Sequence, residues 1–349
     1  MKKLISVLLA GVLALSLAGC GSESQPAGSE ASSGSAGAAQ SGSSDKKLIA
    51  FSQGDNGNSW RVTCTDDLKA TAEARGYEFV WVDAGADPSK QLSDIQDLLS
   101  RKPSILIVDP VQTDALTPCV DMATKANVPL ITIDRAVGAK VGTGTYVANI
   151  VQDFVEVGRQ AGQYTVDYLT KKYGKPQGKV LEISGTVGSS PSIDESNGIR
   201  EVLSKYPDIK IVASQSGDYA RATARTVMDD FLNKYPKGSV DFLISYNDEM
   251  SLGAMQAMED AGRTDLFGAI VSKDGMRDAL GEVVKGRIYA CVQCTPYFGK
   301  TTFDLADKIL KGESYESTVN IPFTDFDMTK NKAATEEYYQ KLMKDNLAY

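Results

Sequence analysis

Nine short apolar runs recur along the sequence, separated by stretches in which apolar residues have helical spacing. The runs cover residues 48–51, 79–82, 105–108, 130–133, 180–183, 209–212, 242–245, 269–271 and 288–294. Their near-continuous apolar character is typical of strands that are buried on both faces of a parallel sheet. Leu116, Cys119, Val120 and Ala123, between two runs, share one helical face. The alternation predicts an α/β fold built on parallel sheets.

The number of runs indicates two doubly wound lobes rather than a single sheet. Nine strands are many for one open sheet, and the chain of 349 residues is long enough for about two domains. The series also divides near residues 145–155, where Gly142, Thr143, Gly144 and Thr145 interrupt it.

Residues 1–20 have the features of a bacterial lipoprotein signal. Lys2 and Lys3 precede the apolar run 4–17, which is shorter than the roughly 20 residues that a bilayer span needs. Residues 17–20 read Leu-Ala-Gly-Cys and look like a lipobox, in which Cys20 is lipidated. We expect a signal peptide over 1–19 and a lipid anchor on the extracytoplasmic face of the cell membrane. A plain signal peptide is the alternative.

Serine, glycine and alanine make up 19 of the 25 residues from 21 to 45. Such a composition cannot build a packed core. Residues 20–46 are therefore interpreted as the lipidated cysteine and a flexible linker. The folded part is expected from residue 47 onward.

The complete absence of histidine excludes several chemistries at once. Ser-His-Asp and Cys-His nucleophile systems, His-ligated metals and an imidazole pH switch all need that side chain. The formal charge is −8, and it becomes −10 when Lys2 and Lys3 leave with the signal peptide. An acidic domain argues against a nucleic-acid surface, which needs a basic footprint. No cofactor and no metal are expected.

Four cysteines follow Cys20, namely Cys64, Cys119, Cys291 and Cys294. Residues three apart in a strand point to opposite faces, so Cys291 and Cys294 are not expected to form a bridge or to share a metal. We predict buried free thiols, with a Cys64–Cys119 disulfide as the open alternative.

Polar and aromatic side chains cluster after the apolar runs, at the expected carboxyl ends of the strands. Ligands of open α/β sheets bind beyond these ends. The predicted ligand-binding residues are Asn58, Ser59, Trp60, Arg61, Asp109, Asp134, Arg135, Asp194, Tyr219, Asn247, Asp274 and Gln293.

The chemistry of these side chains suits a sugar. Asp and Asn oxygens accept hydrogen bonds from hydroxyls, Arg donates to them, and Trp60 and Tyr219 could stack on a ring. Arg61 and Arg135 could instead hold a carboxylate. The nearby acids Asp134 and Asp274 would repel an anion, which favours a neutral polyol.

Most of these residues also have a purely structural explanation. The alternatives are a strand-end turn for Asp109, a helix cap for Asn247 or Asp194, a surface pair for Asp134 and Arg135, a core position for Trp60 and a solvent-facing strand position for Gln293.

Several segments together resemble the ribose-type sugar-binding proteins of bacterial ABC importers. The segments that carry this resemblance are 129–135, 213–219, 247–254 and Asp274-Gly275. Within that family the chain looks most similar to the galactofuranose-binding members. The matching pieces are residues 51–53, 59–61, 185–188, 193–194, 214–218 and 295–296.

The resemblance implies a type I periplasmic-binding-protein fold, with two lobes joined by three hinge crossovers near 148–154, 294–297 and 320–324. The N-terminal lobe would comprise 47–150 plus 296–321, and the C-terminal lobe 151–295 plus 322–349. Ribose binders carry an arginine where this chain has Ile193, which argues against ribose itself.

The function implied is that of a lipid-anchored, monomeric binding protein without catalytic residues. It would take a monosaccharide such as galactofuranose into the cleft and deliver it to an ABC permease and ATPase complex. One alternative is a sensing subunit that reports sugar occupancy to a membrane receptor. Another is a glycosidase that uses Asp134 and Asp274 as its two carboxylates.

Overall fold

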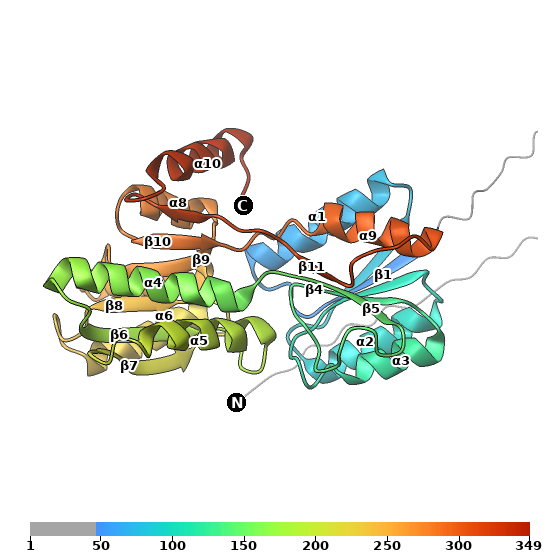
Figure 1. Ribbon diagram of the computed structural model, residues 1–349, viewed down its shortest axis with the longest axis horizontal. Coiled ribbons are helices and arrows are strands. Elements are labelled where there is room, and N and C mark those ends of the chain that lie inside the picture. Colours follow the sequence, from blue (N-terminus) through green and yellow to red (C-terminus); the bar gives the residue numbers. More distant parts are fainter. Residues whose placement is uncertain (1–46) are drawn as a thin grey trace, which may run out of the picture. The chain divides into compact units, whose positions relative to one another are not determined.

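A computed structural model describes residues 47–349 (Figure 1). The expected signal peptide, the lipidation site Cys20 and the linker lie outside the described residues. Within 47–349, the helices are either too short or too polar to traverse a bilayer.

The first sheet has six parallel strands in the order β11-β5-β4-β3-β1-β2. Its strands are β1 (Leu48–Gln53), β2 (Glu78–Asp83), β3 (Ile105–Asp109), β4 (Leu130–Ile133), β5 (Tyr146–Val151) and β11 (Thr318–Asn320). Helix α1 (Ser59–Ala74) packs beside α9 (Gly299–Lys311), and α2 (Pro88–Ser100) packs beside α3 (Pro118–Ala126).

The second sheet also has six strands, in the order β12-β10-β9-β8-β6-β7. They are β6 (Gly178–Ser184), β7 (Ile209–Ser216), β8 (Phe242–Ser245), β9 (Ile270–Asp274), β10 (Ala290–Gln293) and β12 (Asp325–Asp327). Its helices pack in pairs: α4 (Phe154–Tyr173) with α5 (Ser190–Leu203), α6 (Arg221–Lys234) with α7 (Asp248–Asp260), and α8 (Arg277–Val284) with α10 (Lys332–Asp345).

The predicted α/β class with two doubly wound sheets is confirmed, and each of the nine apolar runs forms a strand. Strands β5, β11 and β12 were not predicted. The last two have three residues each and contain polar side chains, so no periodicity marks them. Strand β12 pairs antiparallel with β10, which departs from the expectation of purely parallel sheets.

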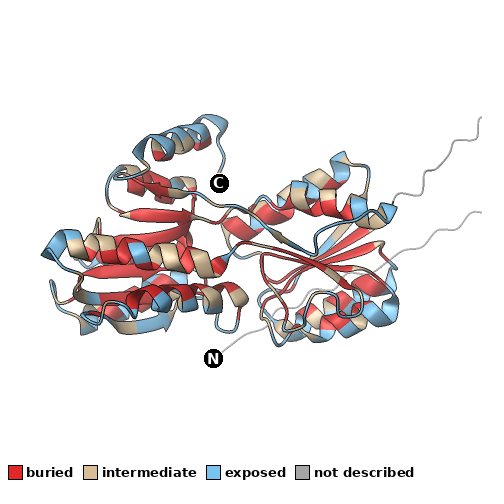
Figure 2. Cartoon of the chain, in the orientation of Figure 1, coloured by how far each residue is buried: buried red, intermediate tan, exposed pale blue. Residues whose placement is uncertain are grey.

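The chain passes between the two sheets three times. It does so between β5 and α4, between β10 and α9, and between β11 and β12. Figure 2 shows the strands buried under helices whose outer faces are exposed. This arrangement explains the continuous apolar runs, because both faces of each central strand lie against helices.

All four cysteines in the described part of the chain are buried and free. Cys64 and Cys119 belong to two separate hydrophobic clusters. The prediction of buried thiols is therefore confirmed, and the alternative Cys64–Cys119 disulfide is excluded.

The free energy of unfolding depends on pH through Glu182, a buried carboxylate on β6. Burial alone would raise the pKa of Glu182, but its bonds to Arg200, Ser214 and Tyr246 outweigh this effect, so the pKa lies below the usual 4.5. A lowered native pKa means that the unfolded chain binds the proton more readily in acid. This stabilisation is complete above the unfolded pKa and disappears as the pH falls through the native one.

We expect the free energy of unfolding to fall below about pH 4.5, with a smaller slope in Glu182→Gln than in the wild type. The difference in slope is at most about 1.4 kcal/mol per pH unit for one proton. Urea unfolding between pH 3 and 7 measures it, with the exposed Glu313→Gln as the control. Identical slopes in wild type and Glu182→Gln would contradict the assignment.

Candidate functional site

A cavity lies where the carboxyl ends of strands from both sheets meet. Eight of the twelve predicted residues line it: Asn58, Trp60, Arg61, Asp134, Arg135, Tyr219, Asn247 and Asp274. Pro191, Lys273 and Cys294 also line it and were not predicted. Ser59, Asp109, Asp194 and Gln293 are not among the lining residues.

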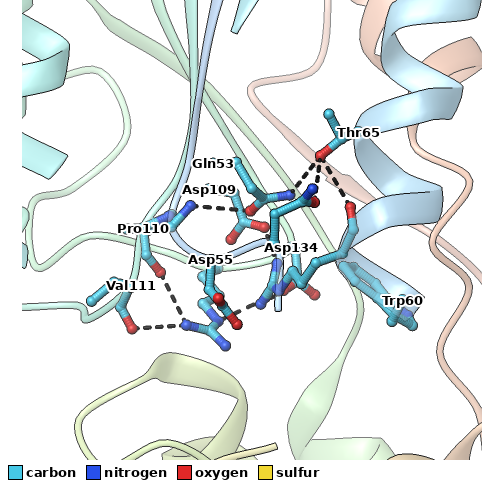
Figure 3. Close-up of polar contacts among 12 residues, drawn as sticks. Gln53, Asp55, Trp60, Thr65, Asp109, Pro110, Val111 and Asp134 are labelled. Carbon is cyan, nitrogen blue, oxygen red and sulfur yellow. Dashed lines mark hydrogen bonds and ion pairs between the residues drawn. The ribbon is translucent and has the colours of Figure 1, made fainter. Parts of the chain in front are cut away.

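Arg61 is fixed from two sides at the start of α1. Asn58 caps this helix, because its side-chain oxygen accepts a hydrogen bond from the Arg61 backbone N–H at 2.9 Å. The guanidinium contacts Asp109 and lies 2.9 Å from Asp134 Oδ2. Asp109 does not line the cavity, and it is instead a buried ion-pair partner that orients the Arg61 guanidinium (Figure 3).

Arg135 follows β4 and has an incomplete set of partners. Its Nη1 donates to the carbonyl oxygens of Val111 at 2.8 Å and Pro110 at 3.4 Å (Figure 3). Its Nε is buried and makes no hydrogen bond to any described residue. Burial, followed by the nearby Arg61, lowers the pKa of Arg135 to about 10. The side chain is thus still a cation at neutral pH, with one fork position free for a ligand oxygen.

Trp60 connects α1 to the second crossover. Its indole Nε1–H donates to the carbonyl oxygen of Cys294 at 2.7 Å, and its ring meets Phe298 edge-on with centroids 5.9 Å apart. The Arg61 guanidinium lies 4.8 Å from the Trp60 ring centroid. The ring is therefore held in one orientation beside the charged groups of the cavity.

Asn247 and Asp274 bring polar groups from the second sheet. The Asn247 side-chain oxygen caps α7 by accepting from Met250 N–H at 2.8 Å. Asp274 has φ of 120°, a conformation that L-residues rarely adopt and that is often found in binding sites. The loop after it is held by Asp248, which accepts from the N–H groups of Gly275 and Met276 at 2.9 and 2.7 Å. Burial raises the pKa of Asp274 well above its usual value.

Tyr219 forms another wall of the cavity. Asp218 and Tyr219 both have left-handed backbone angles, with φ of 56° and 53°. The turn presses the ring against Gly185, where a Cβ atom would lie 2.0 Å from Tyr219 Cζ. The Tyr219 hydroxyl is buried and has no hydrogen-bond partner among the described residues. It is therefore available to a bound molecule.

The remaining predicted residues have other positions. Asp194 is half-buried in α5, beyond the first turn of this helix, where burial and then Asp153 raise its pKa; it is therefore not the helix cap that the sequence offered as an alternative. Gln293 lines a different cleft, with Phe326 and Tyr338 beneath α10. For Gln293 the sequence had offered a non-binding position within the strand run 288–294 as the alternative, and its place outside the cavity agrees with that alternative.

Ser59 belongs to a contact between the two halves of the fold rather than to the cavity. Its hydroxyl donates to Glu249 Oε1 at 2.7 Å and lies 2.9 Å from the hydroxyl of Tyr349. Glu249 is bound in turn by Arg221 at 2.6 Å. We call Ser59, Arg221, Glu249 and Tyr349 the clasp.

A second set of contacts joins the halves along another edge. Thr113 N–H donates to the Gly188 carbonyl at 3.0 Å, and Ala136 N–H donates to Ser190 Oγ at 2.9 Å. With the clasp, these bonds enclose the cavity between the two sheets. Among residues 47–349, no group of His, Cys, Asp and Glu could hold a metal ion.

Comparison with known families finds a match to the periplasmic binding protein domain over residues 49–314. The chain is 33% identical to the ribose import binding protein RbsB of Escherichia coli (strain K12), over 78% of this chain and 88% of that protein. It is 29% identical to the galactofuranose-binding protein YtfQ of the same organism, over 75% of this chain and 82% of that one.

A solved structure supports the same relationship. A protein from Mycobacterium smegmatis in complex with β-D-fucofuranose superposes with a TM-score of 0.78 and 33% identity. The match covers 85% of this chain and 97% of that one.

Proposed function

Because the chain belongs to the periplasmic binding protein family, whose members here are transport proteins and not enzymes, we propose that it is the sugar-binding subunit of an ABC importer. It captures a monosaccharide in furanose form and delivers it to a membrane permease and its ATPase. The observation that carries the proposal is a cavity whose polar walls come from both sheets and whose buried donors and acceptors are only partly paired.

The division of groups between the sheets suits a sugar clamped from two sides. Asp134 and Arg135 come from the first sheet, while Asn247 and Asp274 come from the second. Adjacent hydroxyls can donate to the carboxylates and accept from the guanidinium, and Trp60 offers an apolar ring face. Binding therefore favours the closed arrangement, because only that arrangement brings both sets of groups to one ligand.

The furanose form is supported by the relatives and by one residue of this chain. Proteins that are named or crystallised with galactofuranose and fucofuranose are 29% and 33% identical to it. Ile193, where the resemblance implies an arginine in ribose binders, is 46% exposed and does not line the cavity. This position therefore supplies no cation to a bound sugar.

We further propose that the mature protein is a monomer anchored to the membrane through lipidated Cys20. A Cys20→Ala variant should appear in the aqueous phase of a detergent partition, whereas the wild type should appear in the detergent phase. Equal partition of both forms would refute the anchor.

The function is tested with a thermal-shift panel of D-galactose, D-fucose, L-arabinose, D-ribose and D-fructose, followed by calorimetry. A sugar present at 100 times its Kd stabilises the native state by about 2.7 kcal/mol. The sugar should be recovered unchanged after long incubation. No stabilisation by any sugar would refute the assigned ligand class, and a hydrolysed glycoside would refute a pure binding role.

The fluorescence of Trp60 should change when the sugar binds. Trp60 lines the cavity, whereas the other tryptophan, Trp81, is 37% exposed on β2. We expect a change of roughly 10% or more in intensity or a blue shift, since ring contacts and hydration around Trp60 change. Trp81→Phe should retain the signal and Trp60→Phe should lose it; the opposite pattern would exclude Trp60 from the site.

Removing the clasp should speed sugar release. Ser59→Ala and Tyr349→Phe each take away a hydroxyl that joins the two halves. A neutral hydrogen bond contributes about 1 kcal/mol, so stopped-flow measurements should show about a fivefold faster koff with an almost unchanged kon. Tyr315→Phe, a partly exposed tyrosine on another surface, is the control. Unchanged koff in both clasp variants would show that the clasp does not hold the closed form.

A further inference from the structure

Lys273 is a buried cation that lines the cavity and that lies outside the motifs of the sequence analysis. It occupies the penultimate position of β9, directly before Asp274, and is 6% exposed. Its Nζ lies 2.5 Å from Glu195 Oε1 on α5, in an ion pair buried on both sides. The pair thus extends from the sheet to the helix that carries Pro191, another lining residue.

The ammonium group has more donors than the protein uses. A lysine ammonium carries three N–H donors and no acceptor. In the described part of the chain, Glu195 is its one hydrogen-bond partner. Its other close neighbours are aromatic rings, with the centroid of Tyr219 at 5.0 Å and that of Phe154 at 5.1 Å. Ring faces stabilise a cation, but they are poor substitutes for oxygen acceptors.

The group remains charged although it is buried. Burial alone would lower the pKa of Lys273, but the attraction of Glu195 and then of Tyr219 outweighs this, so the pKa lies well above the usual 10.5. A charged donor of this kind forms stronger hydrogen bonds than a neutral one.

The other cations of the cavity are already engaged by protein oxygens. Arg61 is bound by Asp109 and Asp134, and Arg135 by two backbone carbonyls. Carboxylates can serve only the hydroxyl protons of a sugar, whereas ring oxygens and hydroxyl lone pairs need donors. Within residues 47–349, Lys273 keeps two of its three N–H donors free, and it brings them from the second sheet, opposite Arg61 and Arg135.

We propose that Lys273 is a specificity-determining residue of the cavity: its ammonium, oriented by Glu195, donates a hydrogen bond to one oxygen of the bound sugar. This inference rests on the proposed sugar-binding function. It predicts that the affinity depends on a single oxygen position of the ligand through this residue, rather than on the general shape of the cavity.

The test uses a double variant that avoids an unpaired buried charge. Glu195→Gln combined with Lys273→Met removes both charges and retains a similar side-chain length, since breaking only one member of a buried pair is strongly destabilising. Lys210→Met, an exposed lysine on β7, is the matched control.

Calorimetry with D-galactose, L-arabinose and their monodeoxy and ring-sulfur analogues gives the readout. Lys210→Met should bind within about threefold of the wild type, whereas the double variant should bind about 10- to 100-fold more weakly. The wild type should bind one analogue more weakly than the parent sugar. The double variant should lose this one difference in affinity and keep the wild-type ranking of the other analogues. The melting temperature without sugar should stay near that of the wild type, which shows that the double variant folds.

Three results would overturn the inference. Wild-type affinity in the double variant would show that Lys273 makes no useful contact. An equal loss for every analogue would show that Lys273 only supports the Tyr219 wall. If the wild type binds none of these sugars, the proposed function itself fails, and the role of Lys273 fails with it.

Discussion

Arg135→Ala is expected to weaken sugar binding by about 100-fold or more. The guanidinium is buried, its Nε is unpartnered, and it is held in place by the carbonyl oxygens of Pro110 and Val111. Its N–H donors are therefore already oriented in the absence of ligand. Removing one partner of a buried charged hydrogen bond costs about 2–5 kcal/mol of binding free energy. The acid Asp134 would also lose a neighbouring cation, which lies 3.8 Å away.

Calorimetry on wild type, Arg135→Ala and Arg135→Lys measures this effect. Lysine keeps the charge but lacks the planar fork, so its affinity should lie between the other two. Arg225→Ala, which removes an exposed pair with Asp260, should bind as the wild type does. If Arg135→Ala binds within a few-fold of the wild type, Arg135 is a buried structural residue and not a ligand contact; the surface pair that the sequence offered as an alternative is already excluded by the burial of Asp134 and Arg135.

Gly198→Ala is expected to destabilise the fold, although the same change in a helix is usually favourable. Helices α4 and α5 touch at Gly158 and Gly198, and a Cβ atom on Gly198 would lie 2.0 Å from the backbone oxygen of Val155. Backbone cannot yield as the end of a side chain can, so the helices must separate. We expect a loss of about 3 kcal/mol and a melting temperature lower on the order of 5–10 °C.

Gly281→Ala in α8 is the matched control, because its Cβ would meet only the side chain of Tyr339, with the hydroxyl nearest at 3.3 Å. It should be neutral or stabilising by up to about 1 kcal/mol, the difference in helix propensity between alanine and glycine. Differential scanning calorimetry of both variants and the wild type measures the melting temperatures. Equal melting temperatures for Gly198→Ala and the wild type would mean that the close approach of α4 and α5 does not constrain the fold.

The same helix contact links stability to the site. Gly198 lies one turn after Glu195, the partner of Lys273. Separating α4 from α5 would therefore also displace the ion pair under the cavity. We expect Gly198→Ala to reduce sugar affinity as well, with the melting temperature as the more direct measure.

The sequence by itself determined the α/β alternation, because strand and helix periodicities are local and each buried strand needs apolar residues on both faces. It also predicted eight of the residues that line the cavity, since polar residues at the carboxyl ends of parallel strands must gather at one edge. Asp134, Arg135, Asn247 and Asp274 were found in this way. Strands β11 and β12 could not be found, because three residues carry no period and pairing alone defines them.

Only the tertiary structure decided what each polar side chain does at that edge. Ser59 and Trp60 are neighbours in α1, yet the helix turns one toward the clasp and the other toward the cavity. Asp109 lies behind Arg61 rather than beside the ligand space. Lys273 lies two residues after the apolar run 269–271 and carries no motif, and only the packing of α5 places Glu195 beside it. These roles depend on partners distant in sequence, and distances of that kind have no local signal.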